Sequence, residues 1–376
     1  GLRVYSRVRG KPVDFEPVVR LLGMGLFARR FYGQLIDANG ASYADVDATF
    51  NRIRSLQPQA WAREWRLTAE RFDGIGRAAA AEGRGETAVE LLSKASSYYR
   101  FAEMSLLEDS EHRQELQRAS VDAYLLAGRF MEPPLERVCL PVEGRESPAY
   151  LRFPRGVHRP PVVLIVPGLG MVKEHGDFPP EGLLARGLAA MTVDLPGQGE
   201  SRQQFTLGQP DALSIIRAAI DHLTTRPDLD GERLGVIGTS MGAAAAMLAA
   251  ASDRRIKALV EIAGFYYPTA WWDRFPPQIK EFLRYIIGAA SQDELLDIVR
   301  PVNLEGHVRQ IACPLLVVHG QQDPIIPFGE SDLIYGEATA PKDRMVFPRG
   351  DHGCVNIGEA RPLIADWIAQ RLRSCA

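Results

Sequence analysis

From residue 135 onward the sequence repeats one pattern, in which a short apolar run is followed by a longer segment with helical spacing. These runs span residues 162–166, 190–193, 234–237, 258–262 and 315–318. A strand that is buried on both faces is apolar throughout, whereas a half-exposed strand alternates apolar and polar residues. The runs therefore predict the strands of a parallel sheet, with the helical segments packed on its two faces.

Three further segments extend this sheet. Residues 137–142 and 149–153 are typical of an antiparallel hairpin at its start, and residues 344–347 follow as the last strand. The prediction for residues 133–376 is an α/β domain. Its mostly parallel, eight-stranded sheet is doubly wound and flanked by helices.

Residues 1–132 follow a different pattern. Apolar positions recur at helical spacing in residues 43–56, 61–72 and 89–99, and Gly83 and Gly85 separate two of these helices. Pro133 and Pro134 then prevent a helix from continuing. We expect residues 1–132 to form an α-helical accessory domain, with most of its tryptophans and tyrosines in the core.

The segment Gly238-Thr239-Ser240-Met241-Gly242 carries the strongest chemical signal. Gly-x-Ser-x-Gly alone is common by chance. Here it joins a buried strand to a helix of small residues, the context of a nucleophile elbow, where a strained serine needs small neighbours. The alternative is an ordinary turn with a serine that caps the helix. We predict that Ser240 is a nucleophile.

A serine nucleophile needs a histidine as general base and a carboxylate that orients the histidine. Asp323 follows the run 315–318, and His352 lies in a loop after the last strand, so the chain order is serine, acid, histidine. A turn or cap aspartate is the alternative for Asp323. Asp351 is adjacent to His352, and we assign it to the structure of the loop.

An oxyanion formed at the serine needs two backbone donors. We predict the amide of Met241, the residue after the nucleophile, and the amide of Leu169 in the turn Pro167-Gly168-Leu169-Gly170. A second glycine-rich turn at 194–201 lacks the spacing of a phosphate loop, so nucleotide binding is not expected.

A long insertion at 264–305 separates the runs 258–262 and 315–318 and continues into a helical stretch at 277–300. It is rich in aromatic residues: Phe265, Tyr266, Tyr267, Trp271, Trp272 and Phe275. These side chains form either the core of a small cap or the wall of an apolar pocket, and the two roles are compatible. We name Tyr266, Tyr267, Trp271 and Trp272 as candidate substrate-binding residues.

Composition excludes several classes of partner. A net charge of −3 and a pI near 6.2 give no basis for nucleic-acid binding. No apolar stretch reaches the ~20 residues of a membrane span, no secretory leader is evident, and the cytoplasm is the expected location. The four cysteines lack the spacing of a metal site or a disulfide framework, and we expect Cys354 to be a buried thiol. No His-Glu-x-x-His segment occurs, so we expect no metal or other cofactor.

Five segments, 61–65, 95–100, 194–200, 238–242 and 350–356, resemble the helical-domain α/β hydrolases. That group includes dihydroxy-pseudo-oxynicotine hydrolase, fungal polyketide-shortening hydrolases and the fermentation–respiration switch proteins. The resemblance spans nearly the whole chain. It implies the α/β-hydrolase fold with a helical N-terminal domain over the active site, a helical cap insertion and often a homodimer.

The resemblance also implies a reaction: cleavage of a carbon–carbon bond next to a ketone, or of an ester, in a bulky aromatic or polyketide-like substrate. The expected partner is thus a largely apolar small molecule. Acyl transfer or cyclisation through the same acyl-enzyme is an alternative, because the serine intermediate is common to both. A non-catalytic regulatory protein is a third hypothesis, and the complete set of nucleophile, acid, base and oxyanion turn argues against it.

Overall fold

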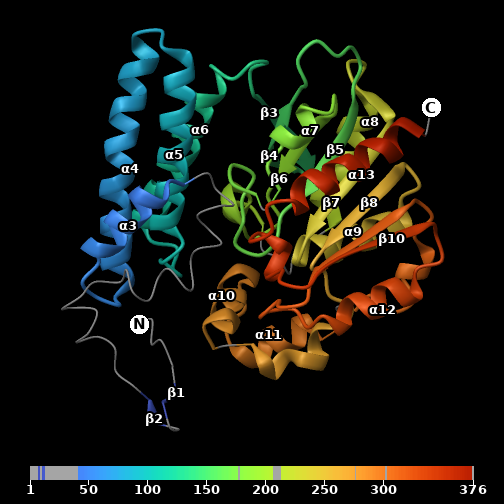
Figure 1. Ribbon diagram of the computed structural model, residues 1–376. Coiled ribbons are helices and arrows are strands. Elements are labelled where there is room, and N and C mark those ends of the chain that lie inside the picture. Colours follow the sequence, from blue (N-terminus) through green and yellow to red (C-terminus); the bar gives the residue numbers. More distant parts are fainter. Residues whose placement is uncertain are drawn as a thin grey trace. The chain divides into compact units, whose positions relative to one another are not determined.

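The computed structural model describes residues 7–8, 11–12, 41–176, 178–205, 213–275, 277–300 and 303–374. The chain divides into two compact units, Gly1–Pro134 and Leu135–Ala376, and each contains a hydrophobic core (Figure 1). In the first unit two short strands pair antiparallel, β1 (Arg7–Val8) and β2 (Lys11–Pro12). Residues 13–40 of the predicted helical domain lie outside the described residues.

The rest of the first unit is helical. Its helices are α3 (Tyr43–Arg52), α4 (Pro58–Ala81), α5 (Gly85–Glu103) and α6 (Glu111–Gly128). The helices predicted from the apolar spacing correspond to α3, α4 and α5. The prediction missed α6 because this helix buries Arg113, Gln117 and Ser120, and such polar residues on the inner face weaken the apolar periodicity.

Trp65 lies at the centre of the core of the first unit and is 1% exposed. Its ring is 5.5 Å from that of Phe50, 5.7 Å from that of Tyr98 and 4.9 Å from that of Phe101. Among the described residues of this half, the expectation that the tryptophans and tyrosines are mostly core residues is confirmed.

The second unit contains an eight-stranded sheet in the order β10-β9-β8-β7-β5-β6-β4-β3. The strands are β3 (Glu136–Val142), β4 (Arg145–Arg152), β5 (Pro161–Val166), β6 (Ala189–Val193), β7 (Asp230–Thr239), β8 (Ile256–Ile262), β9 (Leu315–Gly320) and β10 (Lys342–Phe347). Strands β5 to β10 are parallel, and β3 and β4 form the antiparallel hairpin. All eight predicted strands are present.

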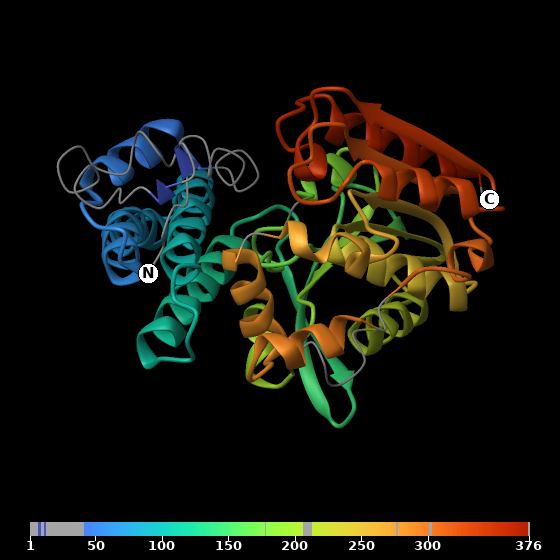
Figure 2. The same ribbon diagram turned by 90° about the horizontal axis from the view of Figure 1, so that it is seen from below.

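Helices cover both faces of this sheet, as the two views in Figures 1 and 2 show. One face packs against α7 (Glu181–Leu184) and α13 (Ala360–Ser374), and the other against α8 (Leu213–Thr225), α9 (Met241–Ser252) and α12 (Gly329–Glu337). The central strand β5 is buried along its whole length and supplies alternate residues to the two cores. This explains why its sequence is continuously apolar.

The predicted insertion contains the helices α10 (Pro277–Ile287) and α11 (Gln292–Val299). Figure 1 shows these orange helices beyond the ends of the strands rather than on a face of the sheet. Short 3-10 helices complete the unit: η1 (Gly199–Gln203), η2 (Pro268–Arg274), η3 (Val308–Gln310) and η4 (His352–Cys354).

Candidate active site

Ser240 stands between the end of β7 and the first turn of α9, with φ 54° and ψ −116°. A non-glycine residue in such a conformation costs of order 1–3 kcal/mol, so the surroundings must hold it. The amide of Ser240 donates to the carbonyl oxygen of Ile262, 2.8 Å away at the end of β8. The Ser240 side chain makes no capping hydrogen bond to α9. The serine therefore has the backbone of an elbow and does not act as a helix cap.

The residue two positions after the serine explains why the elbow needs glycine. A Cβ atom at Gly242 would lie 2.3 Å from the carbonyl oxygen of Val166, the last residue of β5. The first turn of α9 therefore packs directly on the backbone at the end of β5, and only glycine permits this approach.

The structure brings Asp323 and His352 together, although 29 residues separate them in the sequence. The Nδ1 atom of His352 donates to Oδ2 of Asp323 at 2.8 Å. The other carboxylate oxygen accepts from the amides of Ile325 and Ile326 at 2.8 and 2.9 Å. Burial raises the pKa of Asp323, but the hydrogen bond and charge interaction with His352, together with the amides of Ile325 and Ile326, outweigh burial and hold this pKa below its usual range. Asp323 is thus a buried, ionised carboxylate that orients an imidazole.

Backbone contacts hold the loops that carry this pair. The amide of Gln322 donates to the carbonyl oxygen of Gly350 at 2.9 Å, and a Cβ atom at Gly320 would lie 2.3 Å from that same oxygen. A Cβ atom at Gly353 would lie 3.6 Å from Cγ2 of Thr239. The loop of His352 therefore packs against both the loop of the acid and the residue that precedes Ser240.

The two neighbours of His352 that attract attention in the sequence serve the loop itself. The carboxylate of Asp351 accepts from the amides of Val355 and Asn356 at 3.0 and 3.4 Å. Cys354 is 1% exposed in an apolar cluster, and burial raises the pKa of its thiol to about 12. Cys354 is thus a buried, protonated thiol, as expected.

Two elements carry the predicted oxyanion donors. Met241 begins α9, where the first amides of a helix have no intrahelical acceptor. In the turn after β5, the amide of Gly170 donates to the side chain of Gln198, and the amide of Met171 donates to the carbonyl oxygen of Gly168 at 3.3 Å. Among the hydrogen bonds of the described residues, the amide of Leu169 has no acceptor. It remains the candidate second donor in this turn.

The aromatic residues of the insertion have different surroundings. Trp272 is buried with Ile287 and Leu295 in a small cap core. Trp271 is 6% exposed, and its Nε1 atom has no partner among the described residues. The hydroxyl of Tyr266 donates to Glu337 at 2.5 Å, which attaches the insertion to α12.

Tyr267 differs from the other three candidate substrate-binding residues in its exposure. Its side chain is 40% exposed, and its amide donates to Glu330 of α12 at 2.9 Å. The start of the insertion is therefore held against α12 through its backbone.

Sequence reasoning missed a buried carboxyl group on the strand next to the elbow. Glu261 pairs in register with Gly238 of β7, is fully buried, and accepts from the amide of Gly264 at 2.8 Å. Burial raises the pKa of Glu261 to about 8, so its carboxyl is protonated at neutral pH. The available signal was a single charged residue within the apolar run 258–262.

His319 is fully buried in β9 beside the acid. Its Nε2 atom lies 3.2 Å from the carbonyl oxygen of Ile326 and 3.6 Å from Oδ2 of Asp323. Burial lowers the pKa of His319, so the ring is neutral and donates to Ile326. The His319 ring therefore supports the loop of Asp323 through Ile326, and because the ring is neutral it does not form an ion pair with the Asp323 carboxylate.

Neither a metal site nor a membrane span is evident in the described ranges. Among these residues, no three His, Cys, Asp or Glu side chains gather as metal ligands do. None of the helices there combines the length and apolar composition that a membrane crossing needs.

We predict that Glu261→Gln changes how stability depends on pH. Between the ordinary pKa of 4.5 and the raised value of about 8, the folded protein keeps a proton that the unfolded chain releases, so stability falls as pH rises. Glutamine still offers an oxygen to Gly264 but does not titrate. Urea unfolding at pH 5 and pH 8 should show a smaller difference in the variant than in the wild type. The exposed Glu232→Gln on β7 is the control, and an unchanged difference in Glu261→Gln would contradict the prediction.

Two family models match this chain. A family model described as FrsA-like esterase matches residues 42–268, and a model of the prolyl oligopeptidase family matches residues 182–374. The 2,6-dihydropseudooxynicotine hydrolase of Paenarthrobacter nicotinovorans is 31% identical over 341 residues, which are 90% of each chain. The 20-hydroxy-prefusarin hydrolase FUS2 of Gibberella moniliformis is 30% identical over 238 residues, 60% of this chain and 57% of that protein.

A solved structure extends this similarity to the fold. The crystal structure of the 2,6-dihydroxy-pseudo-oxynicotine hydrolase matches with a TM-score of 0.82 and 29% identity, covering 91% of this chain and 96% of the other. The predicted fold and the resemblance seen in the sequence are confirmed. The chain is an α/β hydrolase, and it belongs to the family of FrsA-like esterases.

Proposed function

We propose that this protein is a serine hydrolase that cleaves a carbon–carbon bond next to a ketone, or an ester, through an acyl-enzyme at Ser240. The observation that carries this proposal is the bond between His352 and Asp323, located against the strained elbow of Ser240. A regulatory protein without catalysis has no need for a buried carboxylate–imidazole pair or for a strained serine.

The proposed reaction begins when Nε2 of His352 takes the proton of Ser240 as the serine oxygen attacks the substrate carbonyl. The amides of Leu169 and Met241 donate to the resulting oxyanion, and Asp323 stabilises the imidazolium. The oxyanion collapses and breaks the bond to the leaving group, an alkoxide from an ester or an enolate from a diketone. His352 returns the proton to this leaving group. Water, activated by the same histidine, then hydrolyses the acyl-enzyme.

Two lines of support point to a bulky, largely apolar substrate. The relatives are named as hydrolases of a pseudooxynicotine and of a prefusarin. The insertion supplies Trp271 and Phe275, whose rings are 4.8 Å apart, next to Phe265, 6.3 Å from Trp271. Burying an apolar substrate against such rings contributes about 25 cal/mol per Å². We assign substrate binding to Tyr266, Tyr267, Trp271 and Trp272 as part of this proposal.

The first prediction concerns the covalent intermediate. Mass spectrometry of the protein with a panel of aryl ketones, aryl esters and polyketide thioesters should detect an acyl adduct on Ser240. Ser240→Ala should abolish the adduct and lower turnover roughly 10³-fold or more. Turnover within tenfold of the wild type in this variant would contradict the assignment. Incorporation of ¹⁸O from labelled water into the acid product separates hydrolysis from acyl transfer.

The second prediction concerns the acid. Asp323→Asn keeps the shape of the side chain but removes the charge that fixes the histidine tautomer, so kcat should fall by up to ~10⁴. Asp351→Asn is the matched control, because this carboxylate accepts from the backbone amides of Val355 and Asn356 in the same loop as His352. A harmless Asp323→Asn with an inactive Asp351→Asn would reverse the two roles.

The third prediction concerns acyl size. The ratio kcat/KM should rise steeply from acetyl to naphthoyl esters, because a larger ring system buries more apolar surface. Trp271→Ala should lower kcat/KM for naphthoyl esters and leave it almost unchanged for acetyl esters. A preference for acetyl esters in both proteins would show that these aromatic residues only hold the cap together.

A further inference from the structure

The loop that carries the amide of Leu169 contains two glycines, and glycine leaves a backbone with many accessible conformations. An oxyanion donor works only where it is fixed in advance at the point where charge develops. A contact outside this loop must therefore fix its position. Side chains from the loop after β6, residues 194–201, make these contacts.

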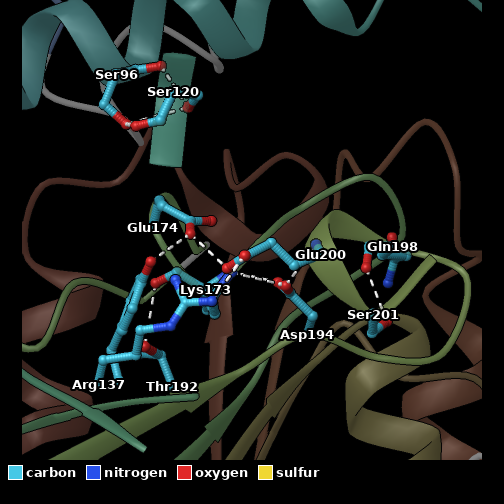
Figure 3. Close-up of polar contacts among 11 residues, drawn as sticks. Ser96, Ser120, Arg137, Lys173, Glu174, Thr192, Asp194, Gln198, Glu200 and Ser201 are labelled. Carbon is cyan, nitrogen blue, oxygen red and sulfur yellow. Dashed lines mark hydrogen bonds and ion pairs between the residues drawn. The ribbon is translucent and has the colours of Figure 1, made fainter. Parts of the chain in front are cut away.

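The first contact is a buried ion cluster around Lys173, drawn in Figure 3. The Nζ atom of Lys173 lies 2.7 Å from Glu174, 3.0 Å from Asp194 and 2.8 Å from Glu200. The other oxygen of Asp194 accepts from the backbone amide of Lys173 at 2.7 Å. Burial lowers the pKa of Lys173, but the surrounding groups, led by Asp194 and Glu174, together outweigh burial and hold this pKa well above its usual range. The cluster joins the β5 loop to the β6 loop through a fully charged lysine.

Both ends of this cluster are anchored to the sheet. Arg137 of β3 donates to Glu200 at 2.9 Å, and the hydroxyl of Tyr150 in β4 donates to Glu174 at 2.9 Å. Thr192 of β6 donates to the carbonyl oxygen of Lys173 at 3.0 Å. The base of the β5 loop is therefore fixed relative to the three strands β3, β4 and β6.

The second contact is closer to the proposed oxyanion donor. Gln198 is 1% exposed, and its Oε1 atom accepts from the amide of Gly170, the residue directly after Leu169. Because the backbone N–H can only donate, it must face the amide oxygen of Gln198 and not the nitrogen. This bond occupies the amide of Gly170 and leaves that of Leu169 available.

We propose that Gln198 is a positioning residue that sets the Leu169 amide for the oxyanion, with the Lys173–Asp194 pair fixing the base of the same loop. This inference rests on the proposed function of the site. Without the acceptor on Gln198, the turn at Gly170 can relax and displace the Leu169 amide. A misplacement of about 1 Å at a reacting centre costs up to about 100-fold in rate.

Gln198→Met is the informative variant, because methionine has a similar length and no strong acceptor. Lys173 is a poorer target, since its removal leaves carboxylates unpaired in a buried site and threatens the fold. Ser201→Ala is the matched control. Ser201 is equally buried, but its hydroxyl bonds only Leu195 and Gln198 carbonyl oxygens within its own loop.

The test combines three measurements on both variants: unfolding by urea, hydrogen exchange of the peptide spanning residues 167–172, and kcat and KM for an aryl ester. We expect Gln198→Met to exchange faster at this peptide and to lose between about 10- and 100-fold in kcat, with KM within about threefold. We expect Ser201→Ala to lose less than threefold in kcat. If Gln198 had only a structural role, two variants that lose equal stability against urea would also lose equal kcat. Equal losses of kcat in Gln198→Met and Ser201→Ala at equal losses of stability would therefore overturn the proposal.

Two outcomes separate this inference from the proposed function. If Ser240→Ala keeps the ester activity, the proposed function is wrong. Hydrogen exchange of residues 167–172 would then still show whether Gln198 holds the loop after β5. If Ser240→Ala is inactive but Gln198→Met keeps wild-type exchange and wild-type kcat, the positioning role is wrong and the serine mechanism stands.

Discussion

The parallel pairing of β5 with β7 determines where the candidate active site of the second unit can lie. Val166 is in register with Gly238, so the loops that follow the two strands start at the same level. The chain continues from β5 to β6 on one side, and from β7 to β8 on the other. This reversal is the topological switch point, where open α/β sheets bind ligands outside the carboxyl ends of the strands. The strained serine and the glycine-rich turn are therefore neighbours because of strand order.

The acid–base pair depends on the same register, extended by two strands. Gly320 ends β9 opposite Phe347 at the end of β10, so the loops after these strands begin side by side. The missing side chain at Gly320 lets the two backbones touch. With both loops fixed, Asp323 and His352 meet without a large loss of side-chain entropy at the moment of reaction. The geometry of the pair is thus a property of the backbone.

The sequence was sufficient to predict elements whose signal is local. Each buried parallel strand is an apolar run, and the elbow has a fixed spacing, so the sheet and the strained turn at Ser240 could be predicted directly. The order of serine, acid and histidine then selected Asp323 and His352 from several candidates. The sequence did not predict that Gln198 and Lys173 contribute to the candidate site. Their roles depend on contacts between two loops that are distant in sequence. Such a contact leaves no periodicity in either segment.

Buried carboxyl groups gather at the carboxyl ends of the strands, and stability alone does not account for them. Apolar replacements of buried ion pairs are often neutral or stabilising. Asp194, Glu261 and Asp323 instead share one kind of contact, since each accepts backbone amides from the loops at this end of the sheet. There the strand ladder stops, and backbone amides lose their regular acceptors. A buried carboxyl group supplies an acceptor oxygen in their place, and the packing of the core fixes the position of that oxygen. The buried polar groups at this end of the sheet therefore fix the irregular loops, as the proposed oxyanion donor and the proposed acid require.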